Sequence, residues 1–286
     1  MDRTLSSRLS PQVHLRSSWT EGTHSPMFAF TAATINLRNR ADRWLARRHL
    51  MVGQLVDSTP DIIALQEISL TVGQGNWLAR QVNIRLTGDS RRPYRLVQVR
   101  RPHPRYYFEA VGIMTRLPVI YHDAYSLGFE GRIAVRVNVE LPAEAAGSRR
   151  QSLDFVSVHL HHESADREVR LQQAMTLVGW LNEKRRVPLQ VIAGDFNEVP
   201  NGPAITFMRQ SYRSAYAEAR GRDPLATFPT NLVQPPLAWA GCLDYVFLSP
   251  AVYRVTAASI FMDKPSPEDD TLYPSDHVGL LVGLEV

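Results

Sequence analysis

The chain has 286 residues, 44% of them apolar, so it can bury a large core in one domain or in two small ones. Its formal net charge of +4, from 32 basic and 28 acidic residues, is compatible with a polyanionic partner but does not require one. The single cysteine, Cys242, excludes an intrachain disulfide framework and a zinc site built on spaced cysteines, and it fits a reducing compartment such as the cytoplasm.

The first 26 residues differ from the rest of the chain. They contain several Arg, Ser and His residues but no apolar segment of the kind found in secretory signals, so we expect a disordered leader. Met27 directly precedes the first strand-like run and is an alternative start of translation. Residues 27–286 contain no linker and no internal repeat, which predicts a single domain. No apolar run approaches the roughly 18 residues of a spanning helix, so stable membrane insertion is not expected.

Short apolar runs alternate with helical periodicity along this domain. Strands are predicted at residues 28–36, 61–66, 94–99, 106–115, 133–141, 153–158, 189–193, 243–248, 255–262 and 278–286. Helices are predicted at residues 41–57, 77–86, 164–183 and 204–219, and a polar hairpin turn at 147–150. Leu45 and Leu55 belong to the apolar stripe of the first helix, and Ser164 is the expected N-cap of the third. This mixture predicts an α/β fold in which two mixed β-sheets pack face to face with helices on both outer sides.

The segment Gly194-Asp195-Phe196-Asn197 follows a nearly all-apolar run that is typical of a buried strand. A carboxylate there can accept a proton or bind a hard cation, and an amide can orient a water or a phosphate oxygen. Ligands of sheet-based folds tend to bind at the carboxyl ends of strands. The alternative is an ordinary turn, because Gly, Asp and Asn also favour turns for backbone reasons.

Similar polar residues recur at the ends of other predicted strands. They are Asn36, Glu67, His159, Asp276 and His277, and Asp244 begins a further strand. Each has a plain alternative interpretation as a turn residue, a solvated acid or a core histidine. Unrelated turns would vary in chemistry, so the recurrence favours one shared site.

The motifs that carry these residues stand in a fixed order along the chain. They are Thr34-Ile-Asn36-Leu, Leu65-Gln-Glu67, Gly112-Ile-Met-Thr-Arg116, Val158-His159-Leu, Gly194-Asp195-Phe-Asn197, Leu243-Asp244-Tyr-Val and Ser275-Asp276-His277. Together they resemble the endonuclease/exonuclease/phosphatase superfamily, which includes pancreatic deoxyribonuclease, abasic-site endonucleases, neutral sphingomyelinases and inositol polyphosphate 5-phosphatases. The resemblance covers about residues 28–284 and implies a four-layer α/β sandwich.

The resemblance also implies a metal site and a base. Glu67 would be the principal ligand of a divalent cation, Mg²⁺ with Mn²⁺ as a possible substitute. Asp276 would lie nearby, and Asn36 would help to orient the metal shell; oxygen ligands of this kind suit hard cations. Asp195 would hold and deprotonate the attacking water, and Asn197 would fix that water or a phosphate oxygen.

The remaining implied roles concern the charge on the phosphate. His277, paired with Asp244, would stabilise the charged transition state, and His159 would contact another phosphate oxygen or assist the leaving group. Arg132 and Arg38 are the candidate phosphate-binding residues.

The expected substrate is a phosphodiester, with nucleic acid favoured by a segment at 91–107 in which arginines alternate with Tyr, Pro and His. A solvated, loop-rich surface is the alternative for that segment. Other possible functions are hydrolysis of a small phosphoester or of a phosphoinositide or sphingomyelin-like headgroup, and a catalytically silent binding module. Trp239 does not stand at the point where abasic-site enzymes carry a tryptophan, which argues against that role. His161 and His162 are expected in a loop at the rim of the site, and no obligate protein partner is evident.

Overall fold

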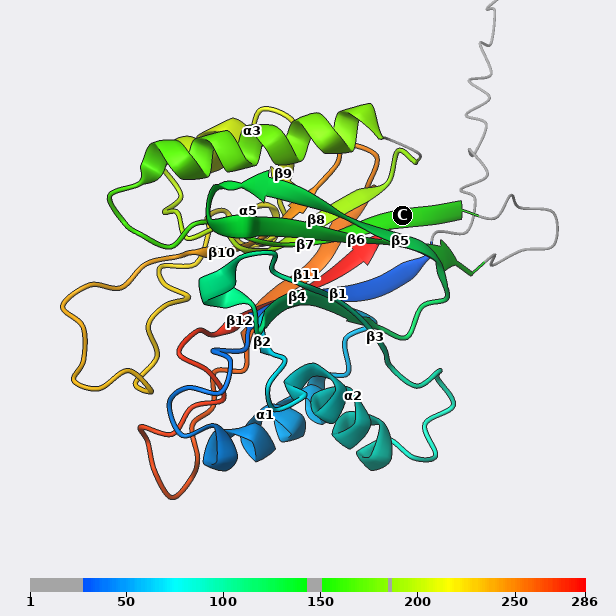
Figure 1. Cartoon of the computed structure of the whole chain (residues 1–286). Helices are drawn as coiled ribbons and strands as arrows, with labels where there is room; N and C mark the ends of the chain where they lie inside the picture. Colours follow the sequence, from blue (N-terminus) through cyan, green and yellow to red (C-terminus); the bar gives the residue numbers. More distant parts are fainter. Residues whose placement is uncertain (1–27, 143–150, 185–186) are drawn as a thin grey trace, which may run out of the picture.

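Two six-stranded β-sheets pack face to face in the computed structural model, which describes residues 28–142, 151–184 and 187–286 (Figure 1). Both sheets are mixed, because each contains one parallel pair of strands among antiparallel neighbours. Helices cover the outer face of each sheet, which confirms the predicted α/β sandwich. The expected leader at 1–26 and the hairpin turn at 147–150 lie outside the described residues.

The two sheets are assembled from distant parts of the chain. The first has the order β11-β12-β1-β2-β4-β3 and the second the order β5-β6-β7-β8-β10-β9. The strands of the first sheet are β1 (Ala29–Asn36), β2 (Ile62–Ser69), β3 (Arg95–Arg100), β4 (Glu109–Thr115), β11 (Arg254–Phe261) and β12 (Gly279–Glu285). Those of the second are β5 (Val119–Gly128), β6 (Arg132–Leu141), β7 (Gln151–His159), β8 (Gln190–Asp195), β9 (Arg213–Ser214) and β10 (Asp244–Leu248).

Helices cover the two outer faces, and one short helix adjoins the core between the sheets (Figure 1). They are α1 (Trp44–Ser58), α2 (Gln74–Arg85), α3 (Arg167–Glu183), α4 (Pro203–Met208) and α5 (Ala215–Arg220), with 3₁₀ turns η1 (Pro104–Tyr106) and η2 (Phe129–Gly131). Helices α1 and α2 pack on the first sheet, α3 and α4 pack on the second, and α5 adjoins the core between the two sheets. None of the helices in the described part of the chain is long and apolar enough to cross a membrane.

The largest core lies between the sheets. Alternate residues of β6, including Val135, Val137 and Val139, are fully buried there, as the two-residue period of a strand requires. Burying such a side chain completely contributes about 1.5–3 kcal/mol. This inner core fixes the position of one sheet relative to the other. Side chains from the strand ends of both sheets can therefore form one site.

Four local predictions were wrong. Strand β5 was missed because it is an edge strand whose residues are mostly exposed, so its sequence lacks an apolar run. The helix predicted at 204–219 is broken, because residues 213–214 pair with β10 and the Ser214 hydroxyl caps α5. On α1, Leu45 is 70% exposed, and the buried face is formed instead by residues such as Trp44 and Met51. Helix α3 begins at Arg167 after Asp166, beyond the expected cap at Ser164.

Each sheet contains a strand–helix–strand unit, β1-α1-β2 in the first and β7-α3-β8 in the second, whose strands run parallel. The carboxyl ends of a parallel pair lie at the same edge of a sheet. In the second sheet, His159 therefore stands opposite Asp195 in the ladder, and Asp244 at the start of β10 stands opposite Asp195 on the other side. This row places three ionisable side chains near Asn36, which ends β1, and Glu67, which lies close to the end of β2.

Candidate active site

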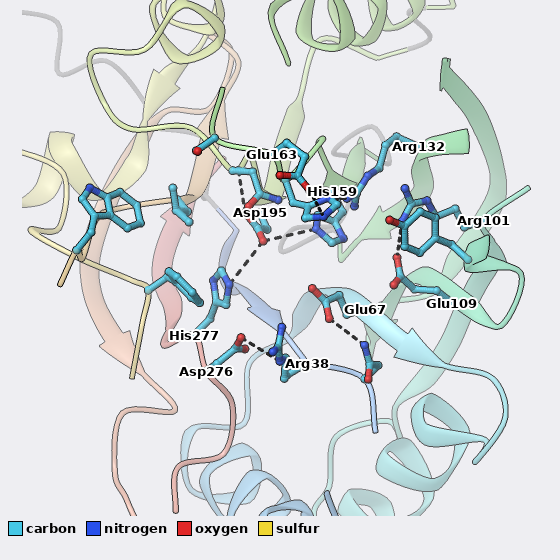
Figure 2. Close-up of a pocket in the computed structure, with 18 residues that line it drawn as sticks. Arg38, Glu67, Arg101, Glu109, Arg132, His159, Glu163, Asp195, Asp276 and His277 are labelled. Atoms are coloured by element: carbon cyan, nitrogen blue, oxygen red, sulfur yellow. Dashed lines mark hydrogen bonds and ion pairs between the residues drawn. The ribbon is translucent and has the colours of Figure 1, made fainter. Parts of the chain in front are cut away.

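A cleft of about 510 Å³ opens where the carboxyl ends of the two sheets meet (Figure 2). The side chains that line it come from both sheets and from the loops that follow their strands. They include Arg38, Asn39, Glu67, Arg101, Tyr106, Glu109, Arg132, His159, His162, Glu163, Asp195, Asn197, Phe228, Trp239, Asp276 and His277. All but two of the predicted site residues therefore line this cleft. The two exceptions lie just behind its wall, where Asn36 contacts Asp195 and Asp244 contacts His277.

Backbone geometry at two positions directs the key carboxylates into the cleft. Glu67 has a positive φ of 50° within a β-bulge between Leu65 and Ile68, which frees it from the regular ladder. Gly194 precedes Asp195 in β8, and a Cβ there would lie 2.1 Å from the Val158 carbonyl oxygen of β7. Only glycine permits this close approach of the two strands.

Asp195 lies at the centre of the site and is 1% exposed. Its Oδ1 accepts a hydrogen bond from the Asn197 backbone N–H at 2.8 Å, and its Oδ2 accepts one from Asn36 Nδ2 at 3.0 Å. Burial raises the pKa of Asp195 to about 7, although the nearby His277 opposes the rise. The carboxyl group therefore has the proton affinity of a general base that works near neutrality.

His277 and His159 lie on two sides of this carboxylate. The Nε2 atoms of His277 and His159 are 3.8 and 3.7 Å from Asp195 Oδ2 (Figure 2). Both separations exceed hydrogen-bond length, so each leaves room for a small oxygen atom to interact with the imidazole and the carboxylate.

The two imidazoles differ in charge because their surroundings differ. Burial by itself would lower the pKa of His277, but Asp244, with Oδ2 2.8 Å from Nδ1, and Asp195 together raise it to about 10. His277 is therefore a cation at neutral pH, with Nε2–H directed at the cleft. Burial, with Arg132 as the next cause, lowers the pKa of His159 well below its ordinary value, so this ring stays neutral. Such a divergence of pKa values is typical of paired catalytic groups.

Arg132 is a buried cation with spare donors. It is 3% exposed, and its Nη2 lies 3.1 Å from His162 Nδ1. Its Nε and Nη1 make no hydrogen bond to any of the described residues. Burial, and then the neighbouring Arg101, lower the pKa of Arg132 to about 10, which still leaves it charged at neutral pH. Figure 2 shows its side chain directed toward His159, so an anion in the cleft can accept hydrogen bonds from the unused N–H groups.

Glu67 is held by two amides on the first-sheet side of the cleft. Asn36 Nδ2 donates to Oε1 and Asn39 Nδ2 donates to Oε2, both at 3.1 Å. Asn36 turns its nitrogen toward Glu67 and Asp195, while its Oδ1 accepts the Arg38 backbone N–H at 2.9 Å. An amide nitrogen that donates hydrogen bonds cannot ligate a cation, so in this orientation Asn36 can act on a metal shell only by positioning the two carboxylates.

Asp276 supplies the second carboxylate beside Glu67. Its Oδ2 lies 3.2 Å from Arg38 Nε, and its Oδ1 accepts a hydrogen bond from the Ser275 hydroxyl at 3.2 Å. Burial raises the pKa of Asp276 and the charge of Arg38 opposes the rise. Arg38, predicted as a phosphate-binding residue, is thus an ion-pair partner of Asp276 and of Asp42, with Nε 2.7 Å from the Asp42 carboxylate.

Several residues that shape the site were not predicted. Asn39 follows the Asn36 motif by three residues, and a second amide near a predicted metal ligand was the available signal. Arg47 is fully buried on α1 and donates to six backbone carbonyls, among them those of Leu37 and Pro274, which fixes the loop carrying Arg38 and Asn39. The available signal for Arg47 in the sequence was a charged residue on the inner face of an amphipathic helix.

The loop before β10 closes the other wall of the cleft. The Thr227 hydroxyl accepts the backbone N–H groups of Leu243 and Asp244, at 2.9 and 3.2 Å. The ring of Phe228 lies 4.8 Å from that of His277 between centroids, and Trp239, which is 49% exposed, lies 6.4 Å from Phe228. This wall is therefore aromatic, and the proline-rich loop gave no sequence pattern that places it at the site.

The basic and aromatic segment at 91–107 is divided between two regions. Arg101 and Tyr106 line the cleft, where the Arg101 guanidinium carbon lies 3.6 Å from the Tyr106 ring centroid. Arg101 is also paired with Glu109 at 3.1 Å. Arg91 and Arg92 line a separate hollow near the opposite edge of the first sheet. Only the second half of the segment can therefore contact a ligand in the cleft.

Comparisons with known proteins agree with this fold. The model of the endonuclease/exonuclease/phosphatase family matches residues 33–277 of the chain. The chain therefore belongs to this family of phosphoester hydrolases. No curated protein matches the chain.

Solved structures with the same fold have low sequence identity to the chain. An endonuclease/exonuclease/phosphatase from Bacteroides vulgatus superposes with a TM-score of 0.69 at 21% identity, over 90% of this chain and 99% of that one. The Bacteroides thetaiotaomicron mannosyl-6-phosphatase has a TM-score of 0.70 at 19% identity, over 89% and 99%. D. rerio TDP2 complexed with a single-strand DNA product has a TM-score of 0.70 at 15% identity, over 90% and 99%. These structures share the fold of the chain.

Proposed function

We propose that the protein is a Mg²⁺-dependent phosphodiesterase that hydrolyses nucleic acid with a water activated by Asp195. The observation that carries the proposal is the position of Asp195 Oδ2, which lies 3.7 Å from a neutral imidazole and 3.8 Å from a cationic one. A base, a hydrogen-bond donor and a neutral imidazole around one small space suit attack on an anionic phosphorus centre.

The metal would be held on the first-sheet side of the cleft. Glu67 and Asp276 offer carboxylate oxygens there, and the donor set contains oxygen only, which suits a hard cation. The amides of Asn36 and Asn39 hold both Glu67 oxygens in place, as expected of groups that orient a metal ligand. When bound, the cation would neutralise charge on the phosphate oxygens.

The side chains of the second sheet would carry out the proton and charge steps. Asp195 takes a proton from the attacking water, with Asn36 and the Asn197 backbone keeping its carboxylate oriented. Asn197 also lines the cleft, where its amide can hold that water or a phosphate oxygen. His277 donates Nε2–H to a phosphate oxygen while Asp244 stabilises the imidazolium. His159 and Arg132 line the same cleft and can contact a further phosphate oxygen or the leaving group.

Nucleic acid is favoured as the substrate by aromatic side chains on both walls of the cleft. Tyr106 stands beside Arg101 on one wall, and Phe228 and Trp239 form the other. Stacking on aromatic rings contributes about 1–3 kcal/mol per base and tolerates any sequence. These rings can therefore hold the nucleotides on each side of the bond that is cut.

A phosphomonoesterase acting on a small molecule is the second candidate. It is favoured by Arg132, whose two unused donor groups are buried in the cleft and would suit the extra charge of a terminal phosphate. The mannosyl-6-phosphatase of the same fold makes this class of substrate a reasonable comparison.

A substrate panel with Mg²⁺ or Mn²⁺ tests the proposal. We expect turnover of oligonucleotides, with an affinity that falls steeply as salt rises, because a polyanion releases counterions on binding. His277→Ala should fold normally and lose at least about 10²-fold in kcat. Turnover confined to sugar phosphates, phosphoinositides or sphingomyelin would replace the nucleic-acid proposal. No turnover of any substrate by the metal-loaded protein would favour a binding module, and full activity of purified His277→Ala would refute the site.

A further inference from the structure

A second group of metal-ligating side chains lies beside the cleft. Glu130, His161 and His162 each offer a ligand atom, and these three atoms lie within 4.8 Å of one another. Glu130 belongs to η2 and has a positive φ of 55°, while the two histidines follow β7. None of them takes part in the proposed hydrolysis.

His161 was expected at the exposed rim, but it is 1% exposed. Its Nε2 lies 2.9 Å from Asp166 Oδ2, to which it can donate a hydrogen bond. Its Nδ1 is buried and has no hydrogen-bond partner among the described residues. A histidine that binds a metal commonly donates its other ring N–H to a carboxylate, which fixes the tautomer and leaves the first nitrogen as the ligand. His161 has this arrangement, because its Nε2 faces the Asp166 carboxylate and its Nδ1 is left as the ligand atom.

The distance between the ligand atoms of His161 and Glu130 fits a tetrahedral ion. His161 Nδ1 lies 3.4 Å from Glu130 Oε2. Bonds of about 2.0–2.2 Å in a tetrahedral zinc site place neighbouring ligand atoms about 3.4 Å apart. The side chain of His162 is 43% exposed and lines the cleft, so it can supply a third ligand and a path for the ion to enter.

The surrounding charges also permit a dication. Arg101 pairs with both Glu109 and Glu130, and Arg132 contacts His162. Against these two guanidinium groups stand the carboxylates of Glu109, Glu130, Glu163 and Asp166. With neutral imidazoles the local balance is therefore negative, which would attract a cation rather than repel it.

We propose that Glu130, His161 and His162 bind a transition-metal dication of the Zn²⁺ class, at a site separate from the magnesium site. Two imidazoles and one carboxylate are borderline-soft donors that select zinc, cobalt or nickel over magnesium. Because His162 Nδ1 lies 3.1 Å from Arg132 Nη2, occupancy of this site changes the surroundings of an arginine in the cleft. The alternative is a metal-free imidazolium of His161 shared by Glu130 and Asp166.

Cobalt substitution tests the proposal through a spectroscopic signal. The full chain carrying Glu67→Gln, which weakens the magnesium site, is stripped with chelator and titrated with Co²⁺. We expect saturable visible absorption of a four-coordinate ion, which Zn²⁺ displaces. His161→Ala should weaken Co²⁺ binding by at least about tenfold, and Asp166→Asn by about 10- to 100-fold.

Two variants keep the result interpretable. His122→Ala removes an exposed histidine of β5 and should leave the Co²⁺ titration unchanged. Asp166→Asn alters a side chain that is 43% exposed, so it provides a test even where His161→Ala fails to fold. Absence of the absorption, or equal Co²⁺ affinity in the His161→Ala or Asp166→Asn protein, would overturn the proposal in favour of the metal-free ion pair.

Discussion

Asp195 should contribute less to the stability of the metal-free protein as pH rises from about 4 to about 7, because its buried carboxyl group favours the protonated form. Burial raises the pKa of Asp195 from 3.8 to about 7. In this interval the unfolded chain has already lost the proton that the folded protein holds, so the free energy of unfolding falls as pH rises. At about 1.4 kcal/mol per pH unit, the gap between the two pKa values sets an upper bound of about 4 kcal/mol. Asp195 is 1% exposed, so solvent screening removes little of this effect.

Asp195→Asn removes the titration and keeps the shape of the side chain. The amide can replace only one of the two acceptor oxygens, so the variant loses one hydrogen bond, at a cost of about 1 kcal/mol at every pH. In the variant His277 retains Asp244, which is the largest of the causes that raise its pKa, as its hydrogen-bond partner. The difference between the two pH profiles therefore reports Asp195.

Urea unfolding in chelator at pH 4.5 and pH 7 measures this difference. We expect the wild-type protein to lose about 2–3 kcal/mol more than Asp195→Asn over the interval. Asp57→Asn, which changes an exposed carboxylate on α1, serves as the control and should follow the wild-type profile. Parallel profiles for wild type and Asp195→Asn would refute the argument that burial holds a proton on Asp195.

Three further substitutions separate catalysis from stability. Arg132→Met should lower kcat/KM by about 10²-fold while the Tm stays the same or rises, because a buried guanidinium with unused donors is removed; an unchanged kcat/KM would contradict its role. Gly194→Ala should lower the free energy of unfolding by about 3 kcal/mol or more in urea titrations, since its Cβ would meet the Val158 carbonyl at 2.1 Å, and a wild-type value would show that β7 and β8 can separate. Arg47→Met leaves six backbone carbonyls without their donor, two of them buried, so we expect a loss of about 3 kcal/mol and weaker Mg²⁺ binding by calorimetry; normal Mg²⁺ affinity would mean that this loop does not shape the metal site.

The sequence predicted the fold, and it predicted residues that line the cleft where polar side chains end regular strands. Asp195 and His159 end buried apolar strands, and that pattern is visible because β7 and β8 are covered on both faces. Strand β5 was invisible for the opposite reason, since an edge strand with mostly exposed residues has no apolar run. The break after α4 depends on pairing between residues 213–214 and β10, a contact that local helical periodicity cannot report.

The charge states of the site could not be predicted from the residue types. His159 and His277 are the same amino acid, yet the burial of one beside Arg132 and the pairing of the other with Asp244 give them opposite protonation at neutral pH. The role of Asn36 likewise depends on which amide atom faces Glu67. These properties follow from contacts between residues far apart in sequence.

The proposed mechanism requires Asp195 as the base and Glu67 as the metal ligand. Calorimetric titration of Mg²⁺ or Mn²⁺ into Asp195→Asn and Glu67→Gln, combined with turnover of the best substrate, tests this division most directly. We predict that Asp195→Asn binds metal within about threefold of wild type while kcat falls by at least about 10²-fold, and that Glu67→Gln loses at least about tenfold in metal affinity. Loss of metal binding in Asp195→Asn, or retention of its turnover, would contradict the account.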